Sequence, residues 1–437
     1  MDWPIALLFL FGILLVFMAT GMPIAFAFML ACAIGAFVFW GGFTGIEELA
    51  VSIFSSVATF AFLPLPLFIL MGTIIFESGV GNMVVDTLGE LMGRVPGRLS
   101  LIAVAAGTIL ATLTGASTAT VAILSKSLLP QMEEYKYDRG MILGPIVASG
   151  QLAPMIPPSS LAIFLAAIGG ISIGKLLMAI IFPGLLMAAL FAAYIVVMCI
   201  FKPSLAPSYT VPSVPFAARL KTVVFHLLPL GVIIFSVVGV IFTGIATPSE
   251  AGGSGIVACY LIAFIYRKLN WRVIKNSAIT AMETTVMILM IIVAAGTFSK
   301  LLSFSGAVTG LVDLAATLHV APIMIVIASQ VLVLFLGTFM GPPAIMMVTM
   351  PIYVPIVQAL GYDPVWFGVM MLIAVETALL TPPVGMNVFV MKSLAPQGVT
   401  TWQVFRAVMP YIGLSVLSIG VVMFVPQIAL WLPSKMG

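Results

Sequence analysis

The sequence predicts an all-α polytopic membrane protein with two related halves of opposite orientation, each holding one re-entrant hairpin and one broken helix. Three observations point to this fold class. The 437 residues are 62% hydrophobic and 7% charged, whereas soluble domains average roughly 45–50% and about 25%. Two passages repeat each other at a spacing of 225 residues, as Pro130 and Pro355 illustrate. The lysines and arginines are distributed so that the two repeats enter the membrane from opposite sides.

The composition excludes a soluble protein, because so few charged residues cannot cover a solvated surface. At about 20 residues per span, the apolar stretches amount to about ten to twelve transmembrane elements. The three cysteines stand singly in apolar runs, and the two histidines, His226 and His319, are far apart. We therefore expect no transition-metal site.

The repeated passages share their helix-breaking residues. Gln151 and Glu376 each stand six residues ahead of a double proline, Pro157-Pro158 in one passage and Pro382-Pro383 in the other. A cluster of small polar residues, 114–120, precedes the first passage, and a Gly/Pro cluster, 337–343, precedes the second. Paired interruptions at matched positions of two apolar halves are typical of transporters built from internal repeats.

A Pro/Ser-rich linker at residues 202–221 divides the first repeat, 1–201, from the second repeat, 222–437. This linker and the loop 267–275 are the richest in Lys and Arg, so we place both in the cytoplasm. Basic residues also flank the stretch 99–132, which predicts a hairpin entering from the cytoplasm. The equivalent stretch, 322–353, has no Lys or Arg and fits a hairpin entering from the outer side. The broken helices are expected at about 140–169 and 364–390.

The tips of the two hairpins are candidate binding elements. Broken backbone at membrane depth is tolerated only in buried or water-lined positions. Its carbonyls and nearby hydroxyls suit sodium-like cations, while helix N-termini attract anions. The alternative is a close helix crossing of small residues, but the pairing of the tips favours a site. The candidates are Thr114, Gly115, Ala116, Ser117, Thr118 and Thr120 in the first tip and Gly337, Thr338, Gly341 and Pro342 in the second.

The double prolines predict that each broken helix unwinds beside its hairpin tip. Two consecutive prolines remove two amide donors and free carbonyls in the preceding turn. A single span of this kind is most often a simple kink, but two at matched positions favour binding elements. The candidates are Pro157, Pro158, Ser159 and Ser160 in the first half and Thr381, Pro382, Pro383, Gly385 and Asn387 in the second.

Glu376 lies inside an apolar span, where a carboxylate is costly and therefore a functional candidate. It could relay protons, balance a cation or anchor broken backbone. The neutral Gln151 at the matched position favours a hydrogen-bonding, structural role. Lys126, two turns past the first tip, is a weaker candidate for binding an anion because the second hairpin has no equivalent.

No nucleotide-binding motif stands in a suitable context, so we expect no cofactor. The glycine-rich run 169–176 lacks the final Ser or Thr of a phosphate-binding loop and follows no strand. Transport energy would then come from an ion gradient or a partner. The sequence has no His/Asp/Glu constellation that would indicate an enzyme, and a non-transporting scaffold would not need two polar hairpin tips. A channel stays possible, although the sequence shows no ring of charges for a pore.

Several motifs resemble the large membrane subunit of tripartite ATP-independent periplasmic (TRAP) transporters. In the first half these are Pro66-Leu-Phe-Ile-Leu-Met-Gly72, Ser78-Gly79, the tip 114–120, Met155-Ile-Pro-Pro-Ser and Pro183-Gly184. In the second half they are Thr247-Pro-Ser-Glu-Ala-Gly252 and Leu380-Thr-Pro-Pro-Val-Gly-Met-Asn-Val-Phe389. The motifs occur in order over nearly the whole chain.

The resemblance implies a bacterial inner-membrane importer of small organic acids (carboxylates), driven by a sodium gradient. Its expected partners are a small four-helix membrane subunit and a periplasmic substrate-binding protein, with no nucleic acid. It also implies an elevator, in which a transport domain slides against a scaffold. Ser117 and the break at Pro157 would form one Na⁺ site. The second hairpin and residues 382–385 would form the other Na⁺ site, and the substrate would lie between the two tips.

This sequence departs from the family pattern at the second tip. The family usually carries Asp in the pattern Gly-Met-Phe-x-Asp-Pro, whereas Gly341 follows Gly337-Thr-Phe-Met here. The second ion site would then lack a carboxylate at this position. In the first tip, Ala116 stands where Ser is common. A related alternative is a stand-alone ion-coupled organic-anion carrier that needs no binding protein. The sequence does not identify the organic acid.

Overall fold

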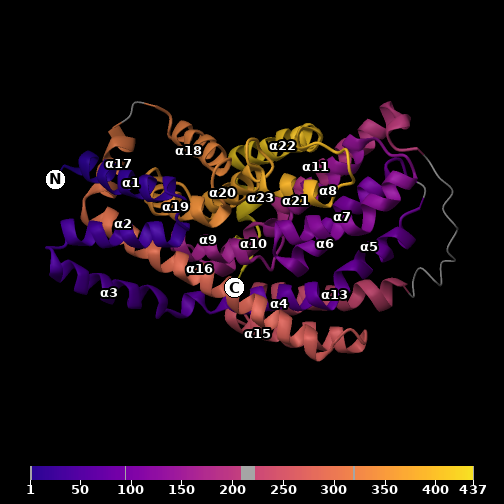
Figure 1. The fold of residues 1–437 in the computed structure, drawn as a ribbon, viewed down its shortest axis with the longest axis horizontal. Coiled ribbons are helices and arrows are strands. Elements are labelled where there is room, and N and C mark those ends of the chain that lie inside the picture. The colour runs from indigo at the N-terminus through magenta and orange to yellow at the C-terminus, as the bar shows by residue number, and fades with distance from the viewer. Residues whose placement is uncertain (1, 94, 208–221, 318–319, 437) are drawn as a thin grey trace.

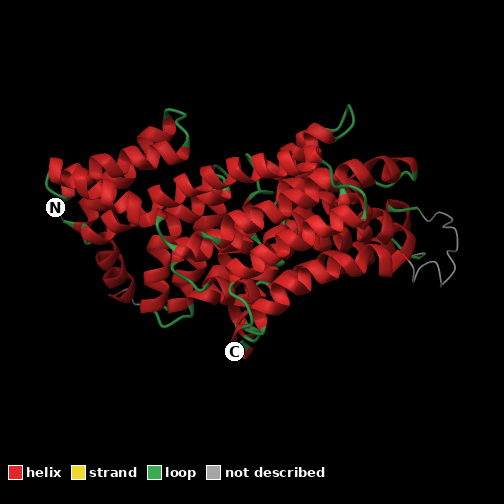
Figure 2. Ribbon diagram, turned by 90° about the horizontal axis from the view of Figure 1, so that it is seen from below, coloured by secondary structure: helices red, strands yellow, loops and turns green. Residues whose placement is uncertain are grey.

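The computed structural model describes residues 2–93, 95–207, 222–317 and 320–436, and these residues form helices and no strand (Figures 1 and 2). Most of the predicted linker, together with Arg94 and His319, lies outside the described residues. The prediction of an all-α protein is confirmed.

The first half contains the helices α1 (Trp3–Ala19), α2 (Ile24–Phe39), α3 (Phe43–Val57), α4 (Pro64–Ser78), α5 (Val80–Leu91), α6 (Arg98–Thr114), α7 (Ser117–Glu134), α8 (Arg139–Gly150), α9 (Ser160–Gly169), α10 (Ile173–Ala179) and α11 (Ile181–Phe201). The second half contains α13 (Leu228–Ile234), α14 (Val240–Phe242), α15 (Pro248–Ile265), α16 (Trp271–Phe304), α17 (Ala307–Thr317), α18 (Pro322–Gly337), α19 (Pro342–Ala359), α20 (Pro364–Ala378), α21 (Met386–Leu394), α22 (Thr401–Phe424) and α23 (Gln427–Leu430).

Six helical stretches of the described chain are long and apolar enough to cross a bilayer on their own. They are Ile173–Phe201, Val223–Phe242, Pro248–Ile265, Trp271–Phe304, Pro342–Ala359 and Thr401–Phe424. A seventh arises if α4 and Met83–Leu91, which meet at a bend of 70°, are counted as one span. Many of the remaining apolar helices have 10–17 residues, which is short for a hydrocarbon core of about 30 Å. Four of these short helices, Arg98–Thr112, Ser160–Gly169, Pro322–Gly337 and Pro364–Ala378, belong to the expected hairpins and broken helices of the two repeats.

The repeats are visible in where the helices begin. The starts of α7 and α19, and those of α8 and α20, are separated by the same 225 residues that separate Gln151 from Glu376. The starts of α6 and α18, and of α9 and α21, deviate from this spacing by a single residue. Each half therefore has the same succession of a helix pair followed by a helix in two pieces. Their depth and orientation in a bilayer stay predictions.

The helix breaks follow from local backbone chemistry. Gly115 has a φ of +60° and ends α6 in the left-handed conformation that favours glycine. After α8, the Ser159 side chain accepts a hydrogen bond from the Ala162 N–H and caps α9. In the second half, Gly385, with a φ of +52°, precedes α21. The peptide bonds between Pro157 and Pro158 and between Pro382 and Pro383 are both cis.

The two halves interlock through these broken helices. The second piece of the first half, α9, packs against α19 of the second half, and α21 of the second half packs against α7 and α8 of the first. Figure 1 shows α21 in yellow beside the purple helices α7 and α8. A second group of helices is centred on α4 and α16: α4 packs against α15 and α16, and α16 also packs against α2 and α3. This group contacts the interlocked helices, because α4 packs on α6 and α9 and α16 packs on α19.

Candidate functional site

The first tip lies between α6 and α7 and contacts the restart of its own broken helix. The Ser160 hydroxyl donates a hydrogen bond to the Gly115 carbonyl at 3.3 Å. A Cβ added to Gly115 would lie 3.8 Å from the Pro158 carbonyl oxygen, so the double-proline segment also faces this tip. The side chain of Thr114 lies outside the described residues. The structure thus brings together residues 115, 158 and 160 of the predicted site.

Ser117 is the first residue of α7 and connects the first tip to the second half. It is buried, and its hydroxyl donates a hydrogen bond of 2.6 Å to Oε2 of Glu376 on α20. Glu376 is 1% exposed, and no ion pair to it is found among the described residues. The carboxylate therefore has a neutral hydroxyl donor as its side-chain partner.

Gln151 and Glu376, which occupy matched positions of the two repeats, contact each other in the protein interior. The Gln151 side-chain amide donates to the Glu376 backbone carbonyl at 3.3 Å. The amide oxygen of Gln151 accepts a hydrogen bond of 2.9 Å from the hydroxyl of Ser415 on α22. All three side chains are buried. Gln151 thereby adds a side-chain donor to a backbone carbonyl near the end of α20, which also accepts from the Leu379 N–H.

Asn387 on α21 is a fully buried amide without a hydrogen-bond partner for either Nδ2 or Oδ1. It lies close to the break of the first half, because a Cβ added to Gly150 would be 3.4 Å from Asn387 Nδ2 and 3.0 Å from the Ser117 carbonyl oxygen. Burial of an unpaired amide is costly, and native proteins usually satisfy such groups. This amide is the strongest indication of a ligand at the junction of α7, α8 and α21.

The second tip lies between α18 and α19. Gly337 packs so closely on α20 that an added Cβ would lie 2.2 Å from the Cβ of Ala378. The backbone of Gly341 is extended, and a Cβ there would lie 3.9 Å from the Met386 sulfur at the start of α21. The second tip therefore also faces the restart of its own broken helix, as the first tip does.

The hydroxyl groups predicted around the second tip donate to their own helices. Thr338 Oγ1 donates to the Phe335 carbonyl at 2.7 Å, and Thr381 Oγ1 donates to the Thr377 carbonyl at 2.9 Å. Their oxygen lone pairs are still available as acceptors. Pro382 is half-buried, like Pro342 of the tip, and Pro383 is exposed.

The remaining candidates of the first half differ in their surroundings. Thr120 Oγ1 donates to the Ala116 carbonyl at 3.2 Å, Thr118 is half-buried and Lys126 is exposed on α7. Pro157 and Ser159 are buried. Sequence reasoning missed Ser415 and Gly150, because an isolated serine in an apolar helix and a glycine in a helix have many structural explanations.

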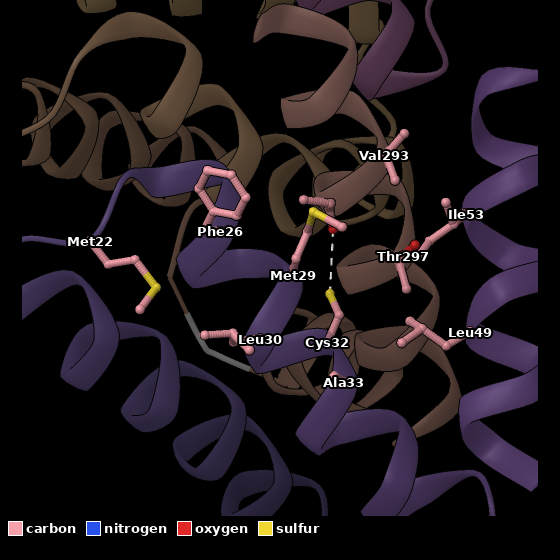
Figure 3. Close-up of a pocket in the computed structure, with 11 residues that line it drawn as sticks. Met22, Phe26, Met29, Leu30, Cys32, Ala33, Leu49, Ile53, Val293 and Thr297 are labelled. Atoms are coloured by element: carbon pink, nitrogen blue, oxygen red, sulfur yellow. Dashed lines mark hydrogen bonds between the residues drawn. The ribbon is translucent and has the colours of Figure 1, made fainter. Parts of the chain in front are cut away.

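An apolar cavity of about 580 Å³ lies elsewhere, between α2, α3 and α16 (Figure 3). Met29, Leu49 and Val293 are among its lining residues, and the Cys32 thiol donates to the Ala294 carbonyl at its wall. None of the predicted site residues lines this cavity. It belongs to the helices around α16 and not to the interrupted helices.

Comparisons with known proteins agree with the resemblance seen in the motifs. Residues 11–428 match the family described as tripartite ATP-independent periplasmic transporter, DctM component. The chain is 30% identical to the C4-dicarboxylate TRAP transporter large permease protein DctM of Rhodobacter capsulatus, over 98% of this chain and 99% of that protein. It is 29% identical to the 2,3-diketo-L-gulonate TRAP transporter large permease protein YiaN of Escherichia coli, over 98% of this chain and 99% of that protein.

A third relative, the ectoine TRAP transporter large permease protein TeaC of Halomonas elongata, is 27% identical over 94% of this chain and 95% of its own. Among solved structures, the YdaH transporter of Alcanivorax borkumensis has a TM-score of 0.64 at 15% identity, covering 90% of both chains. That likeness concerns the fold alone. The matches confirm the family resemblance: this chain belongs to the DctM-component family of TRAP transporters, and it is a large permease subunit, a multi-pass inner-membrane protein and not an enzyme.

Proposed function

We propose that this chain imports a small organic acid across the bacterial inner membrane together with sodium ions, by an elevator movement. A periplasmic binding protein delivers the substrate, and a small four-helix membrane subunit completes the complex. The observation that carries the proposal is the unpaired, buried amide of Asn387 at the place where interrupted helices of both halves meet.

The atoms around the first tip suit sodium. Sodium is a hard cation, and the broken backbone here offers oxygen atoms of carbonyl, hydroxyl and amide groups. The Gly115 and Ser117 carbonyls and the Ser117 hydroxyl belong to the first tip. The Asn387 amide, which carries one oxygen and has no hydrogen-bond partner, lies beside Gly150 with Nδ2 toward that residue. In the described residues no His, Cys, Asp and Glu side chains form a group of three or more, so the donor set consists mainly of neutral oxygens.

The helix ends around the tips suit a carboxylate substrate. The helices α7, α9, α19 and α21 all begin at a tip or a break, and the N-terminus of a helix carries partial positive charge and free N–H groups. Two of the relatives are named for C4-dicarboxylate and for 2,3-diketo-L-gulonate, both of which are carboxylates. An organic acid between the two tips is therefore the substrate class that we propose.

The interlocked packing supports an elevator. Because α9 packs on α19 and α21 packs on α7 and α8, the two hairpins and both broken helices are tied into one body. The helices around α4 and α16 form a second group that could serve as the stationary scaffold. In this proposal the interlocked body carries sodium and substrate past that group.

Uptake into proteoliposomes tests the function. The vesicles would contain this chain with its small membrane subunit, and purified binding protein loaded with candidate organic acids would be added outside. We expect uptake only with both an inward sodium gradient and the binding protein. Uptake without the binding protein would support a stand-alone carrier instead, and uptake without sodium would refute the coupling ion. Ser418→Ala serves as a control, because this buried hydroxyl on α22 donates only to the Leu414 carbonyl of its own helix.

A further inference from the structure

The hydroxyl of Ser117 has a single proton, and its hydrogen bond to Glu376 uses that proton. Oγ of Ser117 lies 2.6 Å from Oε2 of Glu376 and donates to it. A serine hydroxyl offers one donor and two acceptor lone pairs. Once its proton is committed to Glu376, the oxygen can present only lone pairs to any other group. An oxygen in this state can ligate a cation but cannot donate a hydrogen bond to a carboxylate.

We propose that Glu376 is a positioning residue that orients the Ser117 hydroxyl as a cation-accepting oxygen at the first tip. The inference rests on the proposed sodium coupling and deepens it, because it gives a residue of the second half a role in the ion site of the first half. Glu376 acts through Ser117 and need not touch the ion itself. The two residues are 259 positions apart in the chain.

The surroundings of the pair support this role. Ala116, the N-cap residue of α7, supplies no side-chain hydrogen bond to the helix, and its methyl side chain cannot compete with Glu376 as an acceptor for the Ser117 hydroxyl. The Glu376 backbone is held independently, because its carbonyl accepts from the Gln151 amide at 3.3 Å and from the Leu379 N–H at 3.2 Å. The backbone that carries this carboxylate is therefore held without Ser117.

The role depends on an acceptor oxygen and not on the charge. The amide of glutamine also has an oxygen that accepts a hydrogen bond, so Glu376→Gln can preserve the orientation of Ser117. Glu376→Ala and Glu376→Leu both remove the acceptor, and Leu does so while filling most of the volume. Ser117→Ala removes the oriented oxygen itself.

Sodium binding is measured by the melting temperature of the purified permease with its small subunit, titrated with NaCl against choline chloride at constant ionic strength. We expect Glu376→Ala to raise the half-saturating sodium concentration about tenfold, as loss of one fixed ligand would. Glu376→Gln should stay within about twofold of the wild type. In the Ser117→Ala background, Glu376→Ala should add nothing. If the Ala variant does not fold, Glu376→Leu makes the same test, and Ser418→Ala reports the cost of losing a buried hydroxyl elsewhere.

Three results would overturn the inference: an unchanged sodium dependence in the Ala and Leu variants, a Gln variant as weak as these, or additive effects with Ser117→Ala. A weak Gln variant would instead assign the effect to the charge. If sodium does not raise the melting temperature of the wild type, the proposed sodium coupling is refuted. If sodium stabilises the wild type and the Glu376→Ala variant equally, the coupling stands and only the role of Glu376 is refuted.

Discussion

A single added methyl group at Gly337 tests whether the close packing of α18 on α20 holds the second tip in place. In Gly337→Ala, the new Cβ would lie 2.2 Å from the Cβ of Ala378. Carbon atoms in contact prefer about 3.5–4.0 Å, so the helices would have to separate by roughly 1.5 Å at this point. Overpacking of this kind costs about 1–3 kcal/mol. Because the nearest atom is the Cβ of an alanine, no flexible side chain can move aside.

The melting temperature of the purified protein in detergent measures this cost. We expect Gly337→Ala to melt below the wild type, whereas Gly420→Ala should melt at the wild-type temperature or above it. Gly420 lies within α22, and a Cβ there would meet nothing within 4 Å, so alanine brings only its better helix propensity. The exchange Gly337→Ala with Ala378→Gly removes the clash and should recover part of the loss. Equal melting of Gly337→Ala and Gly420→Ala would refute the reasoning.

The other predictions concern the tips and the buried polar cluster. Ser117→Ala should raise the sodium concentration for half-maximal uptake, and an unchanged sodium dependence would remove Ser117 from the ion site. Glu376→Gln should keep transport, because Gln151 occupies the matched position and an amide oxygen can accept from Ser117; loss of uptake in a correctly inserted protein would favour a role for the charge. Asn387→Leu replaces an unpaired buried amide with an apolar side chain of similar size. It should weaken the stabilisation by sodium without lowering the melting temperature measured in the absence of sodium. A large drop in that sodium-free melting temperature would contradict a ligand-binding role. Gly341→Asp should fold normally, because the backbone is extended and a Cβ there meets only the Met386 sulfur at 3.9 Å. If the new carboxylate joins the second ion site, uptake should saturate at a lower sodium concentration. An unchanged sodium concentration at saturation would show that position 341 does not contact the ion.

The sequence predicted much of the helix pattern because its signals are local. Glycines and paired prolines break helices wherever they occur, so the 225-residue offset anticipated the starts of α7 and α19 and of α8 and α20. The all-helical membrane fold and the family are confirmed. The hairpins' depth in the bilayer and the roles of the site residues stay predictions.

The contacts between the halves could not be read from the sequence. The pairing of Ser117 with Glu376, and that of Gln151 with the Glu376 carbonyl, depend on how the two repeats interlock. Ser415 gave no signal, because a serine in an apolar helix usually bonds to its own backbone. The Ser415 hydroxyl lies 2.9 Å from the Tyr411 carbonyl of its own helix as well as 2.9 Å from the Gln151 amide oxygen, and these two acceptors share its one proton. Gly337 was expected to offer backbone at the tip, but the structure shows in addition that it allows the close approach of α20.

The interlocking of α9 with α19 and of α21 with α7 and α8 has a consequence for how the protein is made. During synthesis, α7 and α9 are complete long before α19 and α21 exist. The first hairpin is therefore made before the helices of the second half that pack against it. Neither half contains all the surfaces that enclose its own interruption. Stable assembly of the interrupted helices should therefore be a late, all-at-once event that follows insertion of the last spans. The halves produced as separate polypeptides would have to find each other before either acquired its mature form.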